Sequence, residues 1–588
     1  MARHRWTVRR LVVALACVAL ALRLPALGGR VAHFDEGRVA YWALRYHETG
    51  AVSYRHIVHG PLVRYLDAAL FGLLGPTDAV ARLPVAVVGG LLPLTALWFR
   101  ERLRDGEVFA LAAVLTLNPV LLYYSRFLRS TLLVAACAFV AFGALVRAAD
   151  TRRVRYVYAA SALVAFGFAA KENALVYLLV WVGAAALLVD HGLFRPHTAD
   201  TGVDVVRQYG ERVVAAARSP DRRLLRLVGH AVGVVAVAAV VTLFFFAPRV
   251  PDGVGLWDAL RRPRLFPVVV DAAVTDVGSG LSYWFGGTTE PGCHQESVVT
   301  AYGCFLGRFL RTLALAAGPL SVFAVGGFLL ERYATPDPRP LVLFAAYWGF
   351  VSVVGYPLGT DIYGAWITVN ALVPLALPAA VGLAFVVRLG RAAFDAGDRV
   401  RAGVVAVALL LVAGQVGVTA ATTVYGEPQS AENPLVQYAQ PTGEFRPVFE
   451  RAAGASDAAG PEVVFYGDTF VEPERDSPVP PPCTDLQKAL PLQWYVARAD
   501  LDATCAADAE ALASQLRDGE PTLVVSTVED AAAVRPLLEG YETRRVDLRA
   551  PGRETVFFVR EDTNASASGT STRADVTARS DRVRPGRP

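Results

Sequence analysis

Apolar runs long enough to cross a bilayer recur along most of the chain. A membrane helix needs roughly 17–25 mostly apolar residues, and a helix satisfies its own backbone in lipid. The pattern therefore predicts a polytopic α-helical membrane protein with about eleven transmembrane helices. The predicted spans lie near 10–28, 79–99, 107–124, 130–148, 155–170, 174–190, 228–248, 310–331, 340–358, 364–387 and 402–424.

The first apolar run, at residues 11–27, follows the basic sequence MARHRWTVRR. A signal peptide has the same order of basic and apolar segments. We interpret the run as an uncleaved first span, because it is long for the apolar core of a signal peptide and acidic residues follow it at once.

The arginines indicate which ends of the spans face the cytoplasm, because cytoplasmic loops are rich in Lys and Arg. Arginine-rich connections are 100–104, 147–155, 195–226, 332–339 and 388–401. They alternate with the connections 29–78, 125–129, 171–173, 249–309 and 359–363. This alternation predicts a cell-membrane protein with its N-terminus inside and its C-terminus outside.

The apolar segment 62–74 is short and carries Arg64 and Asp67. Counting it as a span would set every later loop against the arginine pattern. We therefore interpret it as an interfacial or re-entrant helix within the external loop 29–78.

The same external loop holds the stretch 33–61, HFDEGRVAYWALRYHETGAVSYRHIVHGP. Its apolar residues recur at helical spacing, which predicts a helix lying in the membrane interface with aromatic rings at headgroup depth. Those residues are Val39, Ala40, Trp42, Ala43 and Tyr46. Asp35 and Glu36 would then be held at the bilayer surface.

Beyond about residue 431 the pattern changes to short strands alternating with helices. Strand-like runs at 463–466, 522–526 and 555–559 alternate with helix-like runs at 485–498, 507–517 and 530–539. We predict a transmembrane domain over 1–428 and a small extracellular α/β domain over 429–562. The tail 563–588 has no apolar period and is expected to be disordered, with a candidate glycosylation sequon at Asn564.

Composition supports these assignments. The chain has 588 residues, of which 54% are hydrophobic, and its mean hydropathy is +0.39, which excludes an ordinary soluble protein. Cys293 and Cys304 fall in the external loop 249–309, and Cys483 and Cys505 fall in the C-terminal domain. Both pairs lie on the predicted oxidising side, so they are candidate disulfides, although four unpaired thiols fit the spacing as well.

Asp35 and Glu36 are the candidate catalytic residues. A carboxylate near an apolar boundary has a raised pKa and can act as a base toward a hydroxyl or amine. The alternative is structural, because an acid that precedes a helix can cap its N-terminus.

The external motif at 123–129, YYSRFLR, places Arg126 and Arg129 at the outer end of a span. Arginine binds phosphate in bidentate fashion, so these residues are candidates for a prenyl-phosphate headgroup. Snorkelling to lipid phosphates explains the motif equally well. Lys171 and Glu172, in a tight connection between two spans, are further phosphate-site candidates or else form a structural turn.

Three other residues are candidates for lining the same cleft. His59 precedes a rigid Gly-Pro bend that would aim it inward, although a lone loop histidine is usually solvated. Asp361 and Tyr363 precede the tenth predicted span, where aromatic residues commonly anchor a helix at the interface. No histidine spacing indicates a metal site. The absence of a Walker loop or Rossmann fingerprint argues against a soluble nucleotide-sugar site, and we expect no nucleic-acid partner.

Taken together, these motifs resemble a known group of membrane proteins. The acidic pair in the first external loop and the external Ser-Arg motif resemble the GT-C glycosyltransferases, which include protein O-mannosyltransferases and aminoarabinose transferases. The motifs HFDEG, HGPL, YYSRFLR and AKENAL, which begin at residues 33, 59, 123 and 170, are similar to those of the archaeal flippase-activity-associated family of N-glycosylation. The resemblance covers the membrane part, with PLQWY at 491–495 as a weaker match.

The resemblance implies a polyprenyl-phosphate-linked sugar donor, a glycan or protein acceptor outside the membrane, and inverting transfer. It assigns Asp35 as general base, and Arg126 and Lys171 as phosphate ligands. Such an enzyme works with or without a divalent ion. In that family the arginine motif continues into Asn-Asp, whereas here it continues as Ser130-Thr131.

Three functions follow from these observations. A membrane glycosyltransferase would lose transfer when Asp35 is neutralised. A flippase or flippase-accessory protein would change the sidedness of a lipid-linked sugar and leave transfer intact. A scaffold for a glycosylation complex would depend on the C-terminal domain and tolerate acid substitutions.

Overall fold

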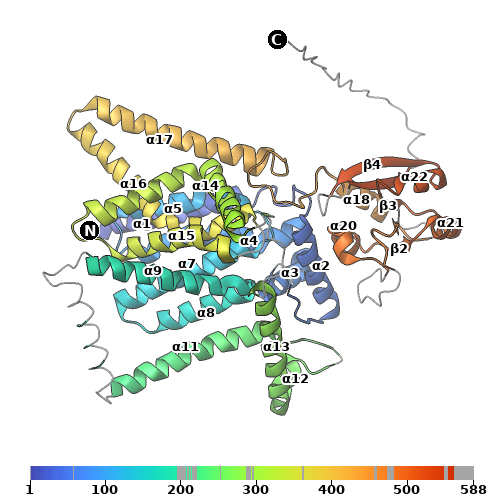
Figure 1. The fold of residues 1–588 in the computed structure, drawn as a ribbon, viewed down its shortest axis with the longest axis horizontal. Coiled ribbons are helices and arrows are strands. Elements are labelled where there is room, and N and C mark those ends of the chain that lie inside the picture. The colour runs from blue at the N-terminus through green and yellow to red at the C-terminus, as the bar shows by residue number, and fades with distance from the viewer. Residues whose placement is uncertain are drawn as a thin grey trace, which may run out of the picture.

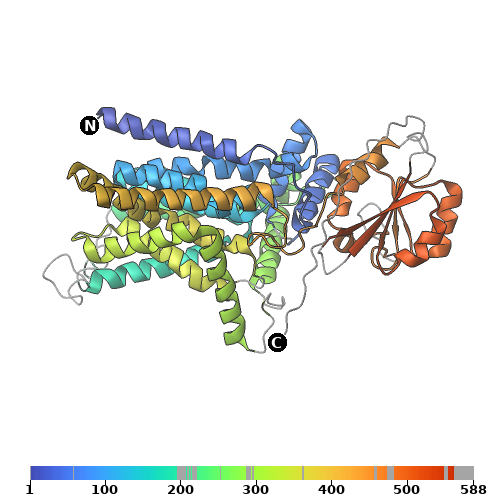
Figure 2. The same cartoon turned by 90° about the horizontal axis from the view of Figure 1, so that it is seen from above.

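The computed structural model describes residues 2–561, except 57–58, 195–206, 208–210, 212–213, 215–221, 252, 286–292, 294–296, 360–362, 456–459, 473–482 and 549–553. A bundle of long helices forms one part, and a small α/β domain lies beyond one end of that bundle (Figures 1 and 2). We call this end of the bundle the domain end. The predicted tail 563–588, with Asn564, lies outside the described residues.

The bundle helices follow the predicted spans closely. They are α1 (Ala2–Arg23), α4 (Asp78–Leu91) continued by η1 (Leu92–Phe99), α5 (Asp105–Leu117), α6 (Pro119–Tyr124), α7 (Ser130–Thr151), α8 (Arg155–Ala170), α9 (Leu175–Phe194), α11 (Arg222–Phe246), α14 (Val298–Leu329), α15 (Pro340–Gly359), α16 (Val369–Asp395) and α17 (Arg399–Ala420).

Within the described ranges, nine helices are long and apolar enough to cross a membrane. They lie at 78–99, 130–151, 172–191, 225–246, 263–284, 299–334, 340–358, 365–395 and 399–426. The predicted spans near 10–28, 107–124 and 155–170 are not in this set, although each is helical. The span near 107–124 is broken because Asn118 ends α5 and then caps α6 through its side chain, with Pro119 at the first position of α6.

Helix α13 (Phe266–Phe285) differs from the other apolar helices in direction. Its length and composition would suit a span, but it runs across the direction of the bundle at the domain end (Figure 1). Trp284 and Tyr283, at its last turn, border a cavity described below. The segment 249–309, predicted as a loop, is therefore largely helical. It also contains α12 (Leu256–Arg261), and a disulfide joins Cys293 to Cys304.

Two short helices, α2 (Phe34–Thr49) and α3 (Pro61–Leu74), lie between the bundle and the α/β domain (Figures 1 and 2). The face of α2 predicted to be apolar is buried at Val39, Ala40 and Ala43. Gly60 and Pro61 begin α3, where proline suits the first helical position because its missing N–H needs no partner there. Both helices thus cover the domain end of the bundle.

The C-terminal part forms a five-stranded mixed sheet in the order β2-β1-β3-β5-β4. Its strands are β1 (Val463–Tyr466), β2 (Ala503–Ala506), β3 (Leu523–Thr527), β4 (Tyr541–Asp547) and β5 (Glu554–Arg560). β1 pairs in parallel with β2 and β3, whereas β5 pairs antiparallel with β3 and β4. A disulfide links Cys505 in β2 to Cys483.

Helices accompany this sheet as the sequence pattern predicts. They are α18 (Arg446–Gly454), α19 (Leu486–Ala489), α20 (Leu492–Arg498), α21 (Ala509–Asp518) and α22 (Ala531–Val534). The predicted helix at 485–498 is divided into α19 and α20, with Pro491 between them. Strands β2 and β4 were not predicted from the sequence.

Helix α20 docks the α/β domain on the membrane part through the buried carboxylate of Asp78. Asp78 accepts hydrogen bonds from Trp494 Nε1 at 2.7 Å, Tyr495 Oη at 3.1 Å and Arg498 Nη1 at 3.0 Å. On the facing helix α2, a Cβ at Gly37 would lie 2.7 Å from Pro491 Cβ, so only glycine allows this close approach.

Candidate functional site

The candidate site is a cavity of about 190 Å³ at the domain end of the bundle. Its walls carry Asp35 together with the cations Arg38, Arg129 and Lys171. Aromatic and amide side chains border it as well, namely Phe34, Asn173, Tyr283, Trp284, Tyr356, Trp366, Asn370 and Tyr438, and Thr131, Val134 and Ile367 complete the lining. One acid, three cations and many rings suit a ligand that joins an anionic group to a sugar.

Arg129 and Asp35 form the charged pair of the cavity. Arg129 Nη2 lies 2.9 Å from Asp35 Oδ2, and both side chains are nearly buried. The Arg129 guanidinium also stacks over the Trp366 ring, 3.7 Å from its centroid. Stacking on an aromatic face fixes the guanidinium plane and leaves its N–H groups for in-plane partners.

The pKa of Asp35 differs from the sequence-based expectation. Burial alone would raise it, as we expected for an acid at an apolar boundary. The positive charge of Arg129 outweighs burial, so the pKa of Asp35 lies below its usual value. Asp35 is therefore a carboxylate at neutral pH.

His33 explains how Asp35 is held at the start of α2. His33, not Asp35, is the N-cap, because its Nδ1 accepts the Asp35 backbone N–H at 3.0 Å. Its Nε2 lies 2.7 Å from the Tyr438 carbonyl oxygen, so Nε2 carries the hydrogen. Burial lowers the pKa of His33, which keeps the ring neutral at pH 7.

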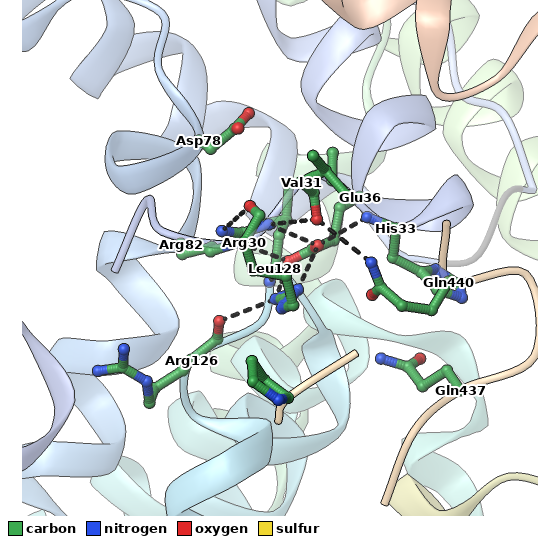
Figure 3. Close-up of polar contacts among 12 residues, drawn as sticks. Arg30, Val31, His33, Glu36, Asp78, Arg82, Arg126, Leu128, Gln437 and Gln440 are labelled. Carbon is green, nitrogen blue, oxygen red and sulfur yellow. Dashed lines mark hydrogen bonds and ion pairs between the residues drawn. The ribbon is translucent and has the colours of Figure 1, made fainter. Parts of the chain in front are cut away.

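Glu36 does not border the cavity, and its carboxylate lies in a polar network (Figure 3). Its two oxygens accept N–H groups of Arg82 at 2.9 Å and of Arg30 at 3.2 Å. They also accept the backbone N–H groups of His33 at 2.9 Å and Leu128 at 2.8 Å. Burial opposes ionisation, but the two guanidinium groups hold the pKa of Glu36 far below its usual value. Glu36 was predicted as catalytic. In the structure its carboxylate instead links Arg30, His33, Arg82 and Leu128.

Arg126 also lies apart from the cavity. Its guanidinium donates to the carbonyl oxygens of Arg23, Pro25 and Ala26, at distances of 2.7 to 3.1 Å. A cation at these carbonyls stabilises the C-terminal end of α1. The two arginines of one motif therefore have different partners, and Arg129, rather than Arg126, borders the cavity.

His59 is buried beside the cavity rather than in it. Its Nε2 lies 3.0 Å from the Leu128 carbonyl oxygen and its Nδ1 lies 2.7 Å from Ser130 Oγ. Burial, with the nearby cations Arg129 and Lys171, lowers the pKa of His59 to about 3, so the ring is neutral. His59 holds the chain on both sides of Arg129 and is not a charged ligand for phosphate.

Lys171 borders the cavity, with its Nζ 4.3 Å from the centroid of the Trp284 ring. The neighbouring Glu172 is fully buried and accepts hydrogen bonds from Tyr54 Oη at 2.8 Å and Trp284 Nε1 at 3.0 Å. Glu172 therefore positions the ring under Lys171 instead of contacting a ligand in the cavity.

Tyr363 lies away from the cavity, because its ring packs against Phe305 and its hydroxyl donates to the Arg308 carbonyl oxygen at 2.9 Å. Asp361 lies outside the described residues. Arg38 and Tyr438 border the cavity but were not predicted. Arg38 is a charged residue of α2 outside its apolar positions, and this was the signal available in the sequence. Tyr438 lies beyond the last span and carried no signal.

A divalent ion was considered from the sequence. The described residues contain no group of three or more His, Cys, Asp or Glu side chains that could hold a metal ion. The cavity instead carries the single acid Asp35 among its cations, and we assign no ion to it.

Comparison with protein families confirms the resemblance seen in the sequence. Residues 58–202 match the family described as dolichyl-phosphate-mannose-protein mannosyltransferase. Residues 445–561 match the family described as Agl23 flippase-associated protein C-terminal domain. No curated protein matches the chain.

Solved structures show a related fold. Apo ArnT from Cupriavidus metallidurans is 15% identical, with a TM-score of 0.54 over 97% of this chain and 100% of that chain. ArnT from the same organism bound to undecaprenyl phosphate is 15% identical, with a TM-score of 0.53 over 93% of this chain and 97% of that chain. The chain is thus a multi-pass membrane protein with an ArnT-like fold, in which a mannosyltransferase-type region is joined to a flippase-associated C-terminal domain.

Proposed function

We propose that this protein is a membrane glycosyltransferase that moves a sugar from a polyprenyl-phosphate-linked donor to a glycan or protein acceptor on the outer face of the membrane. The observation that carries the proposal is the cavity in which Asp35 lies among Arg38, Arg129 and Lys171. The ArnT neighbour bound to undecaprenyl phosphate supports a lipid phosphate as the anionic part of the ligand.

The cations of the cavity suit the departing phosphate. When the sugar C1–O bond breaks, the bonding electrons go to the phosphate oxygen, which gains negative charge. Arg129 and Lys171 border the same cavity, and fixed cations placed where charge develops lower the barrier. Trp284, Trp366 and Tyr438 also border the cavity, so a sugar bound there would pack against aromatic side chains.

Asp35 suits the proton transfer of the same reaction. The acceptor nucleophile attacks C1 from the side opposite the phosphate, which inverts the configuration, and its proton passes to a carboxylate. Asp35 is ionised at neutral pH but is paired with Arg129. A donor phosphate on Arg129 would compete with Asp35 for that cation and bring a negative charge nearby. Both effects raise the pKa of Asp35 and make it a stronger base.

The test is transfer of labelled sugar from a polyprenyl-phosphate donor in membranes of cells that lack this protein and are then complemented. Membranes with Asp35→Asn should transfer about 100-fold or more slowly than the native chain, because general-base groups contribute that much. Asp271→Asn removes an exposed acid of α13 that does not border the cavity, and it should retain full activity.

Equal insertion of all three chains is checked by quantifying them in the membrane. If the Asp35→Asn chain restores transfer as well as the native chain does, Asp35 is not the base of the reaction, and a flippase-associated function becomes the better explanation. If native membranes change only the sidedness of the lipid-linked sugar, the protein acts as a flippase or its accessory.

A further inference from the structure

A segment outside both family matches completes the cavity. Residues 427–442, which we call the strap, connect the end of the bundle to the α/β domain, and the matched regions end at 202 and begin at 445. Tyr438 of the strap borders the cavity directly. The strap therefore brings chain from beyond the last bundle helix into the site.

The strap is anchored on the YYSRFLR motif and on the loop before α2. Tyr123 Oη donates to the Pro428 carbonyl oxygen at 2.7 Å, and Tyr124 Oη donates to that of Leu435 at 2.6 Å. His33 Nε2 donates to the Tyr438 carbonyl oxygen at 2.7 Å. These contacts give the strap a defined position over the residues that border the cavity.

Gln437 of the strap contacts Arg129 at the wall of the cavity. Its Oε1 accepts Arg129 Nε–H at 2.7 Å, and its side chain is 2% exposed. Together, Gln437 and Asp35 occupy the edge of the guanidinium formed by Nε and Nη2. Among the described residues, Nη1 has no hydrogen-bond partner, so the outer edge, Nη1 with the second Nη2 hydrogen, remains for a bidentate anion.

We propose that Gln437 is a positioning residue that orients Arg129 so that the outer edge of its guanidinium receives the phosphate of the lipid donor. This inference rests on the proposed function. An amide suits the role because it fixes Nε without adding charge. A second carboxylate at this point would cancel the cation that the phosphate needs.

The experiment compares binding of undecaprenyl phosphate and of undecaprenol to the purified full-length protein. Undecaprenol lacks only the phosphate, so the ratio of the two affinities reports the phosphate contact. Gln437→Ala should weaken undecaprenyl phosphate binding about tenfold, the value of a hydrogen bond to a charged group, and leave undecaprenol binding unchanged. Gln437→Glu, which keeps shape and acceptor but adds charge, should weaken it at least as much.

Gln440→Ala is the matched control. Gln440 is the other buried strap glutamine near Glu36 in Figure 3, and it donates to the Val31 carbonyl oxygen at 3.4 Å instead of holding Arg129. This variant should keep the native ratio of affinities. Equal weakening of both lipids in Gln437→Ala and Gln440→Ala would show that the strap is only structural and would overturn the inference.

The remaining outcomes separate the two proposals. If the native protein does not prefer undecaprenyl phosphate over undecaprenol, both the proposed function and this inference fail. If the native protein has that preference and Gln437→Ala retains it, only the inference fails. If Gln437→Ala does not fold, the ratio of the affinities for undecaprenyl phosphate and undecaprenol is measured for the near-isosteric Gln437→Glu instead. A native ratio in that variant overturns the inference.

Discussion

Asp35 and Glu36 are neighbours in the chain, yet their side chains lie in opposite environments. Glu36 has both oxygens bonded to two arginines and two backbone N–H groups inside the protein. Asp35 pairs with Arg129 at the wall of the cavity. Adjacent residues at the start of a helix point about 100° apart around its axis, so one turn places the two carboxylates in different environments.

The difference shows how the site can place a carboxylate at the wall of the cavity without losing its shape. Glu36 joins the loop after α1, the start of α2, helix α4 and the loop before α7 through Arg30, His33, Arg82 and Leu128. Because Leu128 immediately precedes Arg129, this network also fixes the backbone from which Arg129 reaches Asp35. Glu36 thereby positions the partner of Asp35.

The largest expected effect tests this division directly. Glu36→Gln should lower the free energy of unfolding by about 3–5 kcal/mol, because removing one partner leaves buried guanidinium groups without compensation. Asp35→Asn should lower it by only about 1 kcal/mol, since it removes one ion pair at the wall of a cavity. Unfolding of both purified variants in mixed detergent micelles gives the two values.

Similar losses of stability in both variants would contradict the division between a structural and a chemical acid. A matched control is Glu48→Gln on the same helix, where the acid is exposed and pairs with Arg45. It should cost less than about 1 kcal/mol, as exposed ion pairs do.

The contrast between the acids also shows what the sequence could predict. Hydropathy located the helices, because burial in lipid demands a long apolar run. The sequence also placed Asp35, Arg129 and Lys171 in one site, but it assigned the phosphate to Arg126, which lies apart from the cavity. Only the family resemblance distinguished Asp35 from Glu36; the local pattern did not, because the difference lies in partners such as Arg82, 46 residues from Glu36 in the chain.

Other differences between the predictions and the structure also arise from contacts between residues that are far apart in the chain. The strap was not predicted, because Gln437 is an ordinary polar residue until the fold brings it to Arg129, 308 residues away. Strand β4 was missed because YETRRVD has several exposed charged side chains, as is usual for an edge strand. Long-range pairing leaves no local pattern that periodicity can detect.

The second prediction concerns the cation that pairs with Asp35. Arg129 lowers the pKa of Asp35, so removing its charge raises that pKa. The base form of Asp35 exists above its pKa, and the acid limb of kcat/KM should therefore move to higher pH in Arg129→Gln, by about one unit or more. The pH profile of sugar transfer measures this shift independently of the loss of rate.

Arg129→Lys is the control for charge, because it retains the cation while losing the guanidinium fork. Its acid limb should stay near the native position, although its affinity for the lipid phosphate falls. An acid limb that does not move in Arg129→Gln would mean that a group other than Asp35 controls the reaction.

The smallest expected effect concerns the second arginine of the YYSRFLR motif. Arg126→Gln should lower the free energy of unfolding by about 1 kcal/mol, because Arg126 caps carbonyl oxygens at the end of α1 and lies over the Tyr425 ring. Its affinity for undecaprenyl phosphate should remain native, whereas Arg129→Gln should bind this lipid weakly. The binding assay with undecaprenol as reference compares the two. Equal losses of affinity would place the phosphate beside the end of α1 and not in the cavity next to Asp35.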